Sequence, residues 1–268
     1  MAQVLVTSRD GTIVSCEHTG TGRPLVIVPG ALFASELWLK VTPLISRRRA
    51  VVVDRRGRGK SGNGAAYSPE REIEDLLAVL ESLEGPVDLL GHSSGAILAL
   101  QVAQRTAANL ERLIVYEPPV FFDAPDRIAS DLPERLEALL SAGKPEAAVE
   151  TFLREGPRAS EAELERTRAR PTWQPLVESF AHTVVYDSRV QREFSPDPAE
   201  LSRIRVRTLM LLGDASPARM RSGAETIAAR LPNATLTELA GQQHMAMLSA
   251  PALFASAVND FLAETPSP

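Results

Sequence analysis

The chain has 268 residues, of which 44% are hydrophobic and 24% are charged, so it can bury a sizeable core in one large or two small domains. Its net charge of −5 and its short basic runs, the longest being Arg47-Arg48-Arg49, exclude a typical nucleic-acid binder. The single cysteine, Cys16, excludes an internal disulfide and a cysteine metal site. No window reaches the roughly 18 apolar residues of a membrane span. We therefore expect a cytoplasmic protein with no nucleic-acid and no membrane partner.

Strands and helices alternate along the first part of the chain. Asp10-Gly11 between two short apolar stretches predicts a hairpin. Ser68-Pro69 opens a helix, because proline is tolerated at the first helical position. A further helical stretch is expected at 38–45. The expected strands lie at residues 4–6, 12–17, 25–28, 50–53, 87–90 and 113–116. Since most of these strands are apolar on both faces, the pattern predicts a mainly parallel sheet covered by helices on both sides.

The alternation stops at Glu117-Pro118-Pro119. The next eighty or so residues contain no convincing strand, and their expected helices lie near 131–141, 145–154, 160–168 and 172–183. Alternation then resumes with strands at 208–212 and 235–239 and helices at 218–230 and 251–262. Ligands bind at the carboxyl ends of parallel strands, so a helical insert between two strands is expected to cover the site. We predict a core domain of residues 1–119 and 201–268 and a helical cap of residues 120–200.

One pentapeptide carries the chemistry, namely Gly91-His92-Ser93-Ser94-Gly95 between a short apolar run and an Ala/Leu-rich helical pattern. Strand, sharp turn and helix with the pattern G-x-S-x-G are typical of a nucleophile elbow. Glycines on both sides of the serine let strand and helix approach without Cβ clashes. The sequence therefore predicts Ser93 as a nucleophile that projects from the end of the sheet. The alternative is a plain Gly/Ser loop that joins a strand to a helix.

A serine hydroxyl becomes a good nucleophile when a base takes its proton. His244 lies in a loop after the last strand and follows Ser93 in chain order, as the arrangement Ser…acid…His requires. His92 cannot turn back onto Ser93 from inside the elbow. His182 falls in the helical insert, where we expect it to line the cap or to lie on a helix surface. We therefore predict His244 as the base.

Together with the turn after Val28, the stretch DRRGRGKS at 54–61 and Gly213-Asp214, these features resemble the α/β-hydrolase fold superfamily. The resemblance covers nearly the whole chain and is to the branch of serine hydrolases with a helical cap after the sixth strand. It implies an oxyanion hole formed by the backbone N–H groups of Ser94 and Ala31. Such a donor stabilises the charge on the carbonyl oxygen and is worth roughly 10²–10³ in rate. Relatives usually carry His-Gly where this chain has Pro-Gly, so Leu32 is an alternative second donor.

The acid that orients the histidine has two candidates. In most relatives it lies two or three residues beyond a glycine, after the strand that here ends at Leu212, but those positions carry no carboxylate. Asp214 lies one residue earlier. Some relatives place the acid after the preceding sheet strand, which here ends at Glu117. One helix plus one strand separates Glu117 from Ser93, a spacing that fits either role of Glu117 without deciding between them. Both acids stay candidates, with a slight preference for Glu117. The structural alternatives are a carboxylate that pins the cap for Glu117 and a turn-forming or helix-capping residue for Asp214.

Further residues are candidates for contact with the substrate. They are Leu32, His92, Phe121 and His182. Aromatic residues such as Phe121 either line an apolar pocket beneath the cap or belong to the core. The 54–61 loop is expected to be structural, with the alternative that Arg56 and Arg58 orient an acidic substrate from the rim.

The chain is therefore expected to be a serine hydrolase that cleaves a small or medium ester, lactone or thioester through an acyl-enzyme. Its expected partner is a small-molecule acyl substrate, and no metal or organic cofactor is needed. The first rival is an acyltransferase, cyclase or perhydrolase that passes the same acyl group to an alcohol, amine or peroxide. The second is a hydrolase-fold binding protein without catalysis. An epoxide hydrolase or dehalogenase is disfavoured, because those relatives need an aspartate where Ser93 stands.

Overall fold

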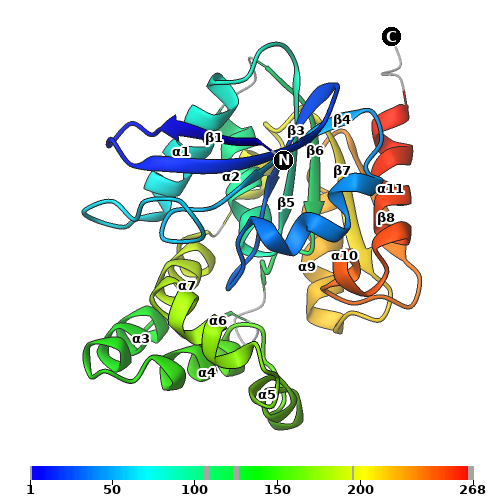
Figure 1. Cartoon of the computed structure of the whole chain (residues 1–268). Coiled ribbons are helices and arrows are strands. Elements are labelled where there is room, and N and C mark those ends of the chain that lie inside the picture. The colour runs from blue at the N-terminus through cyan, green and yellow to red at the C-terminus, as the bar shows by residue number, and fades with distance from the viewer. Residues whose placement is uncertain (1, 106–108, 123–126, 195, 265–268) are drawn as a thin grey trace.

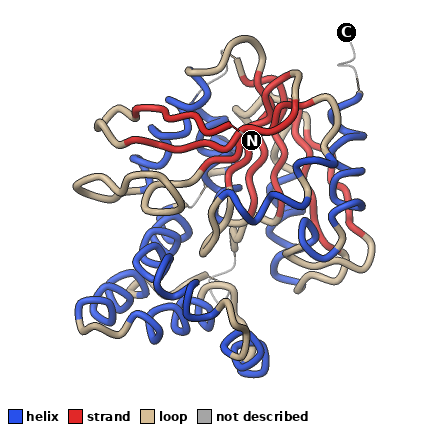
Figure 2. The backbone as a smooth tube through the Cα atoms, viewed as in Figure 1, coloured by secondary structure: helices blue, strands red, loops and turns tan. Residues whose placement is uncertain are grey.

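The structure, a computed structural model, describes residues 2–105, 109–122, 127–194 and 196–264. At its centre lies an eight-stranded sheet with the order β1-β2-β4-β3-β5-β6-β7-β8 (Figures 1 and 2). The strands are β1 (Ala2–Thr7), β2 (Ile13–Gly20), β3 (Arg23–Val28), β4 (Arg48–Val53), β5 (Val87–His92), β6 (Leu110–Tyr116), β7 (Arg207–Gly213) and β8 (Ala234–Leu239). The β1–β2 and β2–β4 pairs are antiparallel, and the pairs from β4 to β8 are parallel. The predicted hairpin and the mainly parallel sheet are confirmed.

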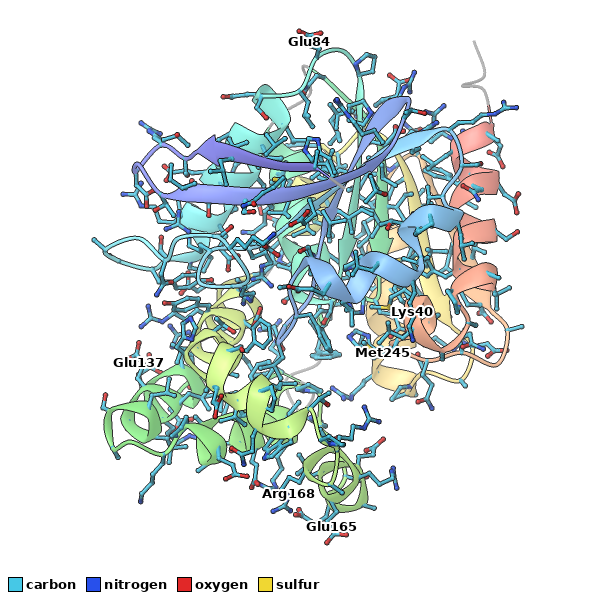
Figure 3. The ribbon with its side chains drawn as sticks, viewed as in Figure 1. Lys40, Glu84, Glu137, Glu165, Arg168 and Met245 are labelled. Carbon is cyan, nitrogen blue, oxygen red and sulfur yellow. The ribbon has the colours of Figure 1, made fainter. Side chains whose placement is uncertain are left out.

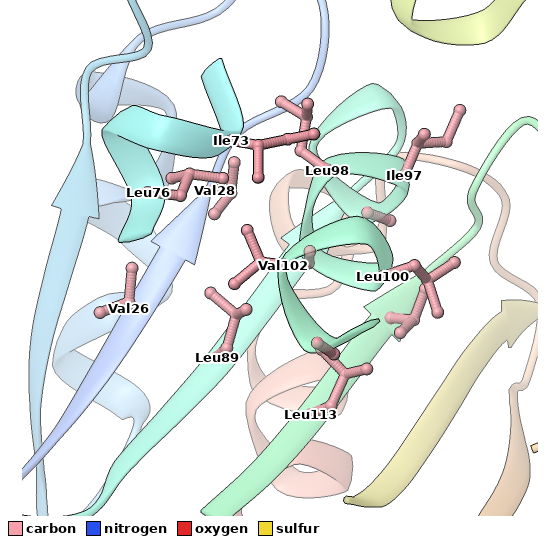
Figure 4. Close-up of a cluster of buried hydrophobic side chains, with 14 of the residues drawn as sticks. Val26, Val28, Ile73, Leu76, Leu89, Ile97, Leu98, Leu100, Val102 and Leu113 are labelled. Carbon is pink, nitrogen blue, oxygen red and sulfur yellow. The ribbon is translucent and has the colours of Figure 1, made fainter. Parts of the chain in front are cut away.

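Helices cover both faces of this sheet, because successive strand residues point to opposite sides and both sides are apolar. Val26 and Val28 of β3 pack in the cluster on one face, with α1 (Pro69–Glu81), α2 (Ser94–Arg105) and α9 (Ala218–Ala228). Figure 4 shows this cluster, in which labelled side chains of α1 and α2 lie among those of the strands, with Val28 of β3 beside Leu76 of α1. Leu25 and Ile27 pack in the cluster on the other face, with η1 (Ser35–Lys40), the two residues that flank η2 (Thr42–Leu44), α10 (Ala246–Ser249) and α11 (Pro251–Ala263).

The helix expected at 38–45 forms instead as two short 3₁₀ helices, η1 and η2. Pro43 lies in the first turn of η2 and has no N–H group, so it cannot continue a helical ladder from η1. Trp38 of η1 and Val41, which follows η1, are completely buried and pack in the cluster on this face of the sheet.

Between β6 and β7, the described residues form helices and loops but no strand. The helices are α3 (Leu132–Ser141), α4 (Pro145–Glu155), α5 (Glu161–Arg168), α6 (Trp173–Phe180), η4 (Ala181–Thr183), α7 (Val184–Glu193) and α8 (Pro198–Leu201). The helices α3 to α7, here called the cap, gather beyond the carboxyl ends of the strands (Figure 1). All of them except α5 contribute to a hydrophobic cluster, which Leu32 from the turn after β3 joins. The fold is thus the α/β-hydrolase fold with a cap after the sixth strand, as predicted.

Two details of the cap differ from, or go beyond, the sequence analysis. Helix α7 was not expected, since the last predicted helix of the insert ended at residue 183. Its buried residues include Asp187 and Ser188 beside valines, so it lacks a purely apolar face that a pattern search detects. The boundaries of the predicted domains stay a prediction, because residues 123–126, 195 and 265–268 lie outside the described residues.

Within the described ranges, no helix is both long and apolar enough to cross a membrane. Figure 3 shows that the labelled charged residues Glu137, Glu165 and Arg168 lie on the outer side of the cap, whereas Lys40 and Met245 lie on the core. These charged side chains therefore lie on the outside of the cap.

The close approach of α2 to the end of β3 yields a first prediction. A Cβ atom at Gly95 would lie 2.3 Å from the Val28 carbonyl oxygen and 2.5 Å from that of Pro29, and neither backbone can yield cheaply. We expect Gly95→Ala to lower the free energy of unfolding by more than about 2 kcal/mol, measured by urea denaturation. Gly62→Ala is the matched control, since its new Cβ would meet nothing closer than 3.4 Å. Equal stability of the two variants would contradict the packing described here.

Candidate active site

Ser93 occupies the turn between β5 and α2 with a left-handed backbone, at a φ of 55°. Its N–H group donates to the Tyr116 carbonyl at 2.9 Å, and its own carbonyl accepts from the N–H group of Ala96 at 2.9 Å. A left-handed conformation costs a non-glycine residue roughly 1–2 kcal/mol, so these surrounding bonds must hold it. The predicted elbow is present, and the plain loop is not.

The turn after β3 packs directly against this serine. A Cβ atom at Gly30 would lie 2.8 Å from the Ser93 Cβ and 3.1 Å from the Nδ1 atom of His92. Only glycine fits there without displacing the elbow. The turn that bears Ala31 is thereby held close to the nucleophile candidate.

His244 and Glu117 meet although 127 positions separate them in the chain. The His244 Nδ1 atom lies 2.7 Å from Glu117 Oε2. The other carboxylate oxygen, Oε1, accepts hydrogen bonds from the Gly213 N–H group at 2.8 Å and from the Ser216 hydroxyl at 2.5 Å. Glu117 also has a left-handed backbone, at a φ of 45°, and follows directly after β6 as Ser93 follows β5. The residues that directly follow the adjacent strands β5 and β6 are thus both held in a left-handed backbone conformation.

The environment of Glu117 favours its ionised form. Burial opposes ionisation, but the hydrogen bond and charge of His244 outweigh it, with help from Ser216 and Gly213, and they hold the Glu117 pKa below its usual value. The carboxylate is completely buried, whereas the His244 side chain is about one third exposed, at 36%. The pair therefore joins a buried anion to an imidazole that reaches solvent.

Asp214 occupies a different place. Its Oδ1 atom accepts a hydrogen bond from the Gly241 N–H group at 2.6 Å, and the residue is exposed. This bond ties the end of β7 to the loop after β8. Of the two acid candidates, the structure brings Glu117 to His244 and gives Asp214 the turn-forming contact.

Two further side chains hold the loop that carries His244. His92 Nε2 donates to the His244 carbonyl at 2.9 Å, and the two imidazole rings lie 4.7 Å apart. The Tyr116 hydroxyl donates to the Gln243 carbonyl and accepts from the Ala246 N–H group at 3.1 Å. Burial holds the pKa of His92 well below its usual value, so its ring is neutral.

The sequence analysis missed Tyr116 and Ser216 as contributors to this site. A signal existed for Tyr116, since a tyrosine at the end of a fully buried strand must find a partner for its hydroxyl. No sequence signal pointed to Ser216, because its partner Glu117 lies 99 positions away.

The proposed oxyanion donors lie on the two elements that flank Ser93. Ser94 is buried and begins α2, and the first N–H groups of a helix have no carbonyl partner inside it. Ala31 and Leu32 follow Gly30, and Leu32 has a left-handed backbone at a φ of 61°. Their roles as donors stay a prediction.

The other predicted contact residues are spread around the site. Leu32 is buried in the cap cluster. The guanidinium of Arg219 lies over the ring of Phe121 at 5.1 Å, and Phe121 lines a cavity of about 200 Å³ where the cap joins the core. His182 Nε2 donates to the Gly57 carbonyl at 2.8 Å, which ties the cap to the 54–61 loop. Contact of these residues with a substrate stays a prediction.

The alternative interpretation placed Arg56 and Arg58 on the rim of the site, but neither side chain lies at the surface. Arg56 makes two hydrogen bonds of 2.7 Å to Asp75, and Arg58 makes one of 2.8 Å to Asp187. Both guanidinium groups are completely buried. The loop is structural. Among the described residues, no group of three or more histidine, cysteine, aspartate or glutamate side chains is arranged to hold a metal ion.

Comparison with known proteins identifies the family of the chain. Residues 25–257 match the alpha/beta hydrolase family. The crystal structure of an alpha/beta hydrolase from Sphaerobacter thermophilus is 35% identical, with a TM-score of 0.89 over 97% of this chain and 100% of that one. The chain therefore belongs to the alpha/beta hydrolase family and has its fold. This family is one of hydrolytic enzymes.

Two curated proteins are similar in sequence. One is the (E)-2-((N-methylformamido)methylene)succinate hydrolase of Acinetobacter baylyi, 24% identical over 92% of this chain and 93% of that protein. The other is the N-formylmaleamate deformylase of Pseudomonas putida, 32% identical over 129 residues, which are 47% of this chain and 48% of that protein. The second match thus spans about half the length of either protein.

The lowered pKa of Glu117 predicts a pH-dependent contribution to stability. Because the folded-state pKa lies below the unfolded one, the stability from ionised Glu117 is complete above about pH 5 and is lost as the pH falls through the folded-state value. We expect the gap in unfolding free energy between wild type and Glu117→Gln to narrow as the pH falls from about 5 to about 3. Urea denaturation at several pH values measures it.

The control for this measurement is Glu84→Gln, at an exposed position far from the cap (Figure 3). It should differ from wild type by less than about 0.5 kcal/mol at every pH. A Glu117→Gln gap that stays the same down to pH 3 would show that the carboxylate is not stabilised as an anion.

Proposed function

We propose that the protein is a serine hydrolase that cleaves a small or medium acyl compound through an acyl-enzyme, with Ser93, His244 and Glu117 as its triad. The observation that carries the proposal is the 2.7 Å contact between His244 Nδ1 and buried Glu117. Ser93, which has a left-handed backbone, is tied to the same strand end, because its N–H group donates to the carbonyl of Tyr116, the residue before Glu117. Glu117 is preferred to Asp214 because the Asp214 carboxylate binds the Gly241 N–H group. The family to which the chain belongs supports the class of reaction.

The chemistry follows from these positions. Glu117 accepts the Nδ1 proton of His244, which leaves the Nε2 lone pair free to take the proton of the Ser93 hydroxyl. The Ser93 oxygen attacks the acyl carbon, and the backbone N–H groups of Ser94 and of Ala31 or Leu32 stabilise the charged oxygen. His244 then passes the proton to the leaving group. Water, activated by the same imidazole, attacks the acyl-enzyme and releases the acid.

The leaving group is an alcohol or thiol in the first form of the proposal, which covers esters, lactones and thioesters. The names of both curated relatives specify a formyl group on nitrogen, which favours a second candidate, the hydrolysis of an N-formyl amide. The same residues serve that reaction. Ser93 would take the formyl group, His244 would protonate the leaving nitrogen, and water would release formate.

Replacing the nucleophile tests the common core of both candidates. Ser93→Ala should lower kcat by at least about 10³-fold, since the triad acts as a unit. The assay is a panel of esters of increasing chain length, lactones and N-formyl amides, followed by acid and formate release. Wild type, but not Ser93→Ala, should be labelled by a fluorophosphonate probe. An active Ser93→Ala variant would overturn the proposal, and a wild-type protein that does not label would favour a binding protein.

The choice of acid is tested by a matched pair of variants. Glu117→Gln keeps the size of the side chain but removes the charge that holds the His244 tautomer, and it should lower kcat by up to about 10⁴-fold. Asp214→Asn should change kcat by far less, because the Asp214 carboxylate binds the backbone N–H group of Gly241 in a turn and not His244. If Asp214→Asn showed the larger loss, the assignment of the acid would be wrong.

A further inference from the structure

A ring of four buried charges joins three elements that are distant in sequence. Arg55 makes two hydrogen bonds of 2.7 Å to Glu72 of α1 and one of 2.9 Å to Asp187 of α7. Arg58 donates to Asp187 at 2.8 Å and lies 3.7 Å from Glu72. None of the four side chains is more than 2% exposed. The two positive and two negative charges compensate each other inside the protein.

Such a ring is costly as a purely structural device. Removing each ion from water costs several kcal/mol, and apolar residues of similar volume often serve stability equally well. Burial opposes ionisation of Asp187, but Arg58 and Arg55 outweigh it and hold its pKa below the usual value, so the charge persists. The residues that the ring contacts therefore indicate what it does besides adding stability.

The ring reaches both sides of the proposed oxyanion hole. Arg55 Nη1 donates to the Pro29 carbonyl at 3.3 Å, just before the turn that bears Ala31. The same nitrogen lies 3.0 Å from the Ser94 hydroxyl, and that hydroxyl donates to Asp187 Oδ1 at 2.8 Å. Ser94 supplies the other proposed donor. One guanidinium and one carboxylate thus bridge the end of β3 and the start of α2.

We propose that Asp187 of the cap is a positioning residue for the oxyanion hole, acting with Arg55 to hold Ser94 and the turn after β3 at a fixed separation. The inference rests on the proposed function, because it concerns the same acyl transfer. Oxyanion donors act only when they lie about 2.7–3.1 Å from the charged oxygen, so a small change in this separation weakens them. Figure 1 shows α7 as the cap helix next to the core, and the cap thereby takes part in forming the site.

The test compares two isosteric charge removals. Asp187→Asn breaks the ring, whereas Asp75→Asn removes the partner of Arg56, which binds the same loop to α1 without touching Pro29 or Ser94. We expect Asp187→Asn to lower kcat by about 10-fold or more and to change KM by less than about 3-fold, because the oxyanion forms only in the transition state. Asp75→Asn should lower stability and leave kcat unchanged.

A second readout separates positioning from general loosening of the fold. A boronic acid or trifluoromethyl ketone inhibitor forms a tetrahedral adduct with the serine and places an oxygen in the oxyanion hole. Its affinity for Asp187→Asn should fall by the same factor as kcat, whereas the affinity of the unreactive amide analogue of a substrate should not fall. Ser94→Ala keeps the N–H donor but removes the hydroxyl link. It should give a smaller loss of the same kind, and its effect should not add to that of Asp187→Asn.

Several outcomes would overturn the inference. The first is an equal kcat for Asp187→Asn and Asp75→Asn, and the second is a change in Asp187→Asn that is confined to KM. The third is a wild-type kcat and a wild-type inhibitor affinity in Ser94→Ala. This third outcome decides the matter if Asp187→Asn does not fold. These results are distinguishable from failure of the proposed function. If Ser93→Ala abolishes activity and Asp187→Asn does not alter it, only the positioning role falls. If wild type does not hydrolyse any acyl substrate of the panel, both proposals fall.

Discussion

The close packing of the start of α2 between the ends of β3 and β5 is the constraint on which the site depends. Neither Gly91 nor Gly95 can bear a Cβ atom, because each would meet backbone atoms within 2.6 Å. This packing leaves no room for the turn at Ser93 to relax, so the serine keeps a left-handed conformation that it would not adopt by itself. The strain is tolerated because β5, which leads into the turn, and its neighbours β3 and β6 are almost wholly buried.

Two buried carboxylates then give the site its electrostatic character, and they differ in what they face. Glu117 faces the imidazole of His244, a group whose protonation can change during a reaction. Asp187 faces Arg55 and Arg58, whose charges are permanent. The first arrangement suits proton transfer, and the second suits a fixed geometry. Both need partners that come from distant parts of the chain.

Much of the fold was predictable, because the signals for it are local. Apolar runs of four to eight residues, turn residues and a helical stripe identify strands and helices through backbone geometry alone. The helical stretch expected at 38–45 is present, but it is broken at Val41 into the 3₁₀ helices η1 and η2, since Pro43 has no N–H group to continue the ladder. Helix α7 was not predicted because it buries the charged residue Asp187. A charged residue is expected to be buried only where its ion-pair partners are known, and the sequence does not show them.

The sequence by itself determined the alternation of strands and helices, the elbow around Ser93 and the candidacy of His244, since chain order and local pattern define all three. Only the tertiary structure decided which carboxylate meets the imidazole. Glu117 and Asp214 each follow a strand of the same sheet, so sequence spacing treats them alike, but in the folded chain Glu117 meets His244 and Asp214 meets the Gly241 N–H group. The charge ring has the same origin. Arg55, Glu72 and Asp187 become neighbours only when the sheet, α1 and the cap are packed together, because hydrogen bonds act over about 3 Å in space regardless of distance along the chain.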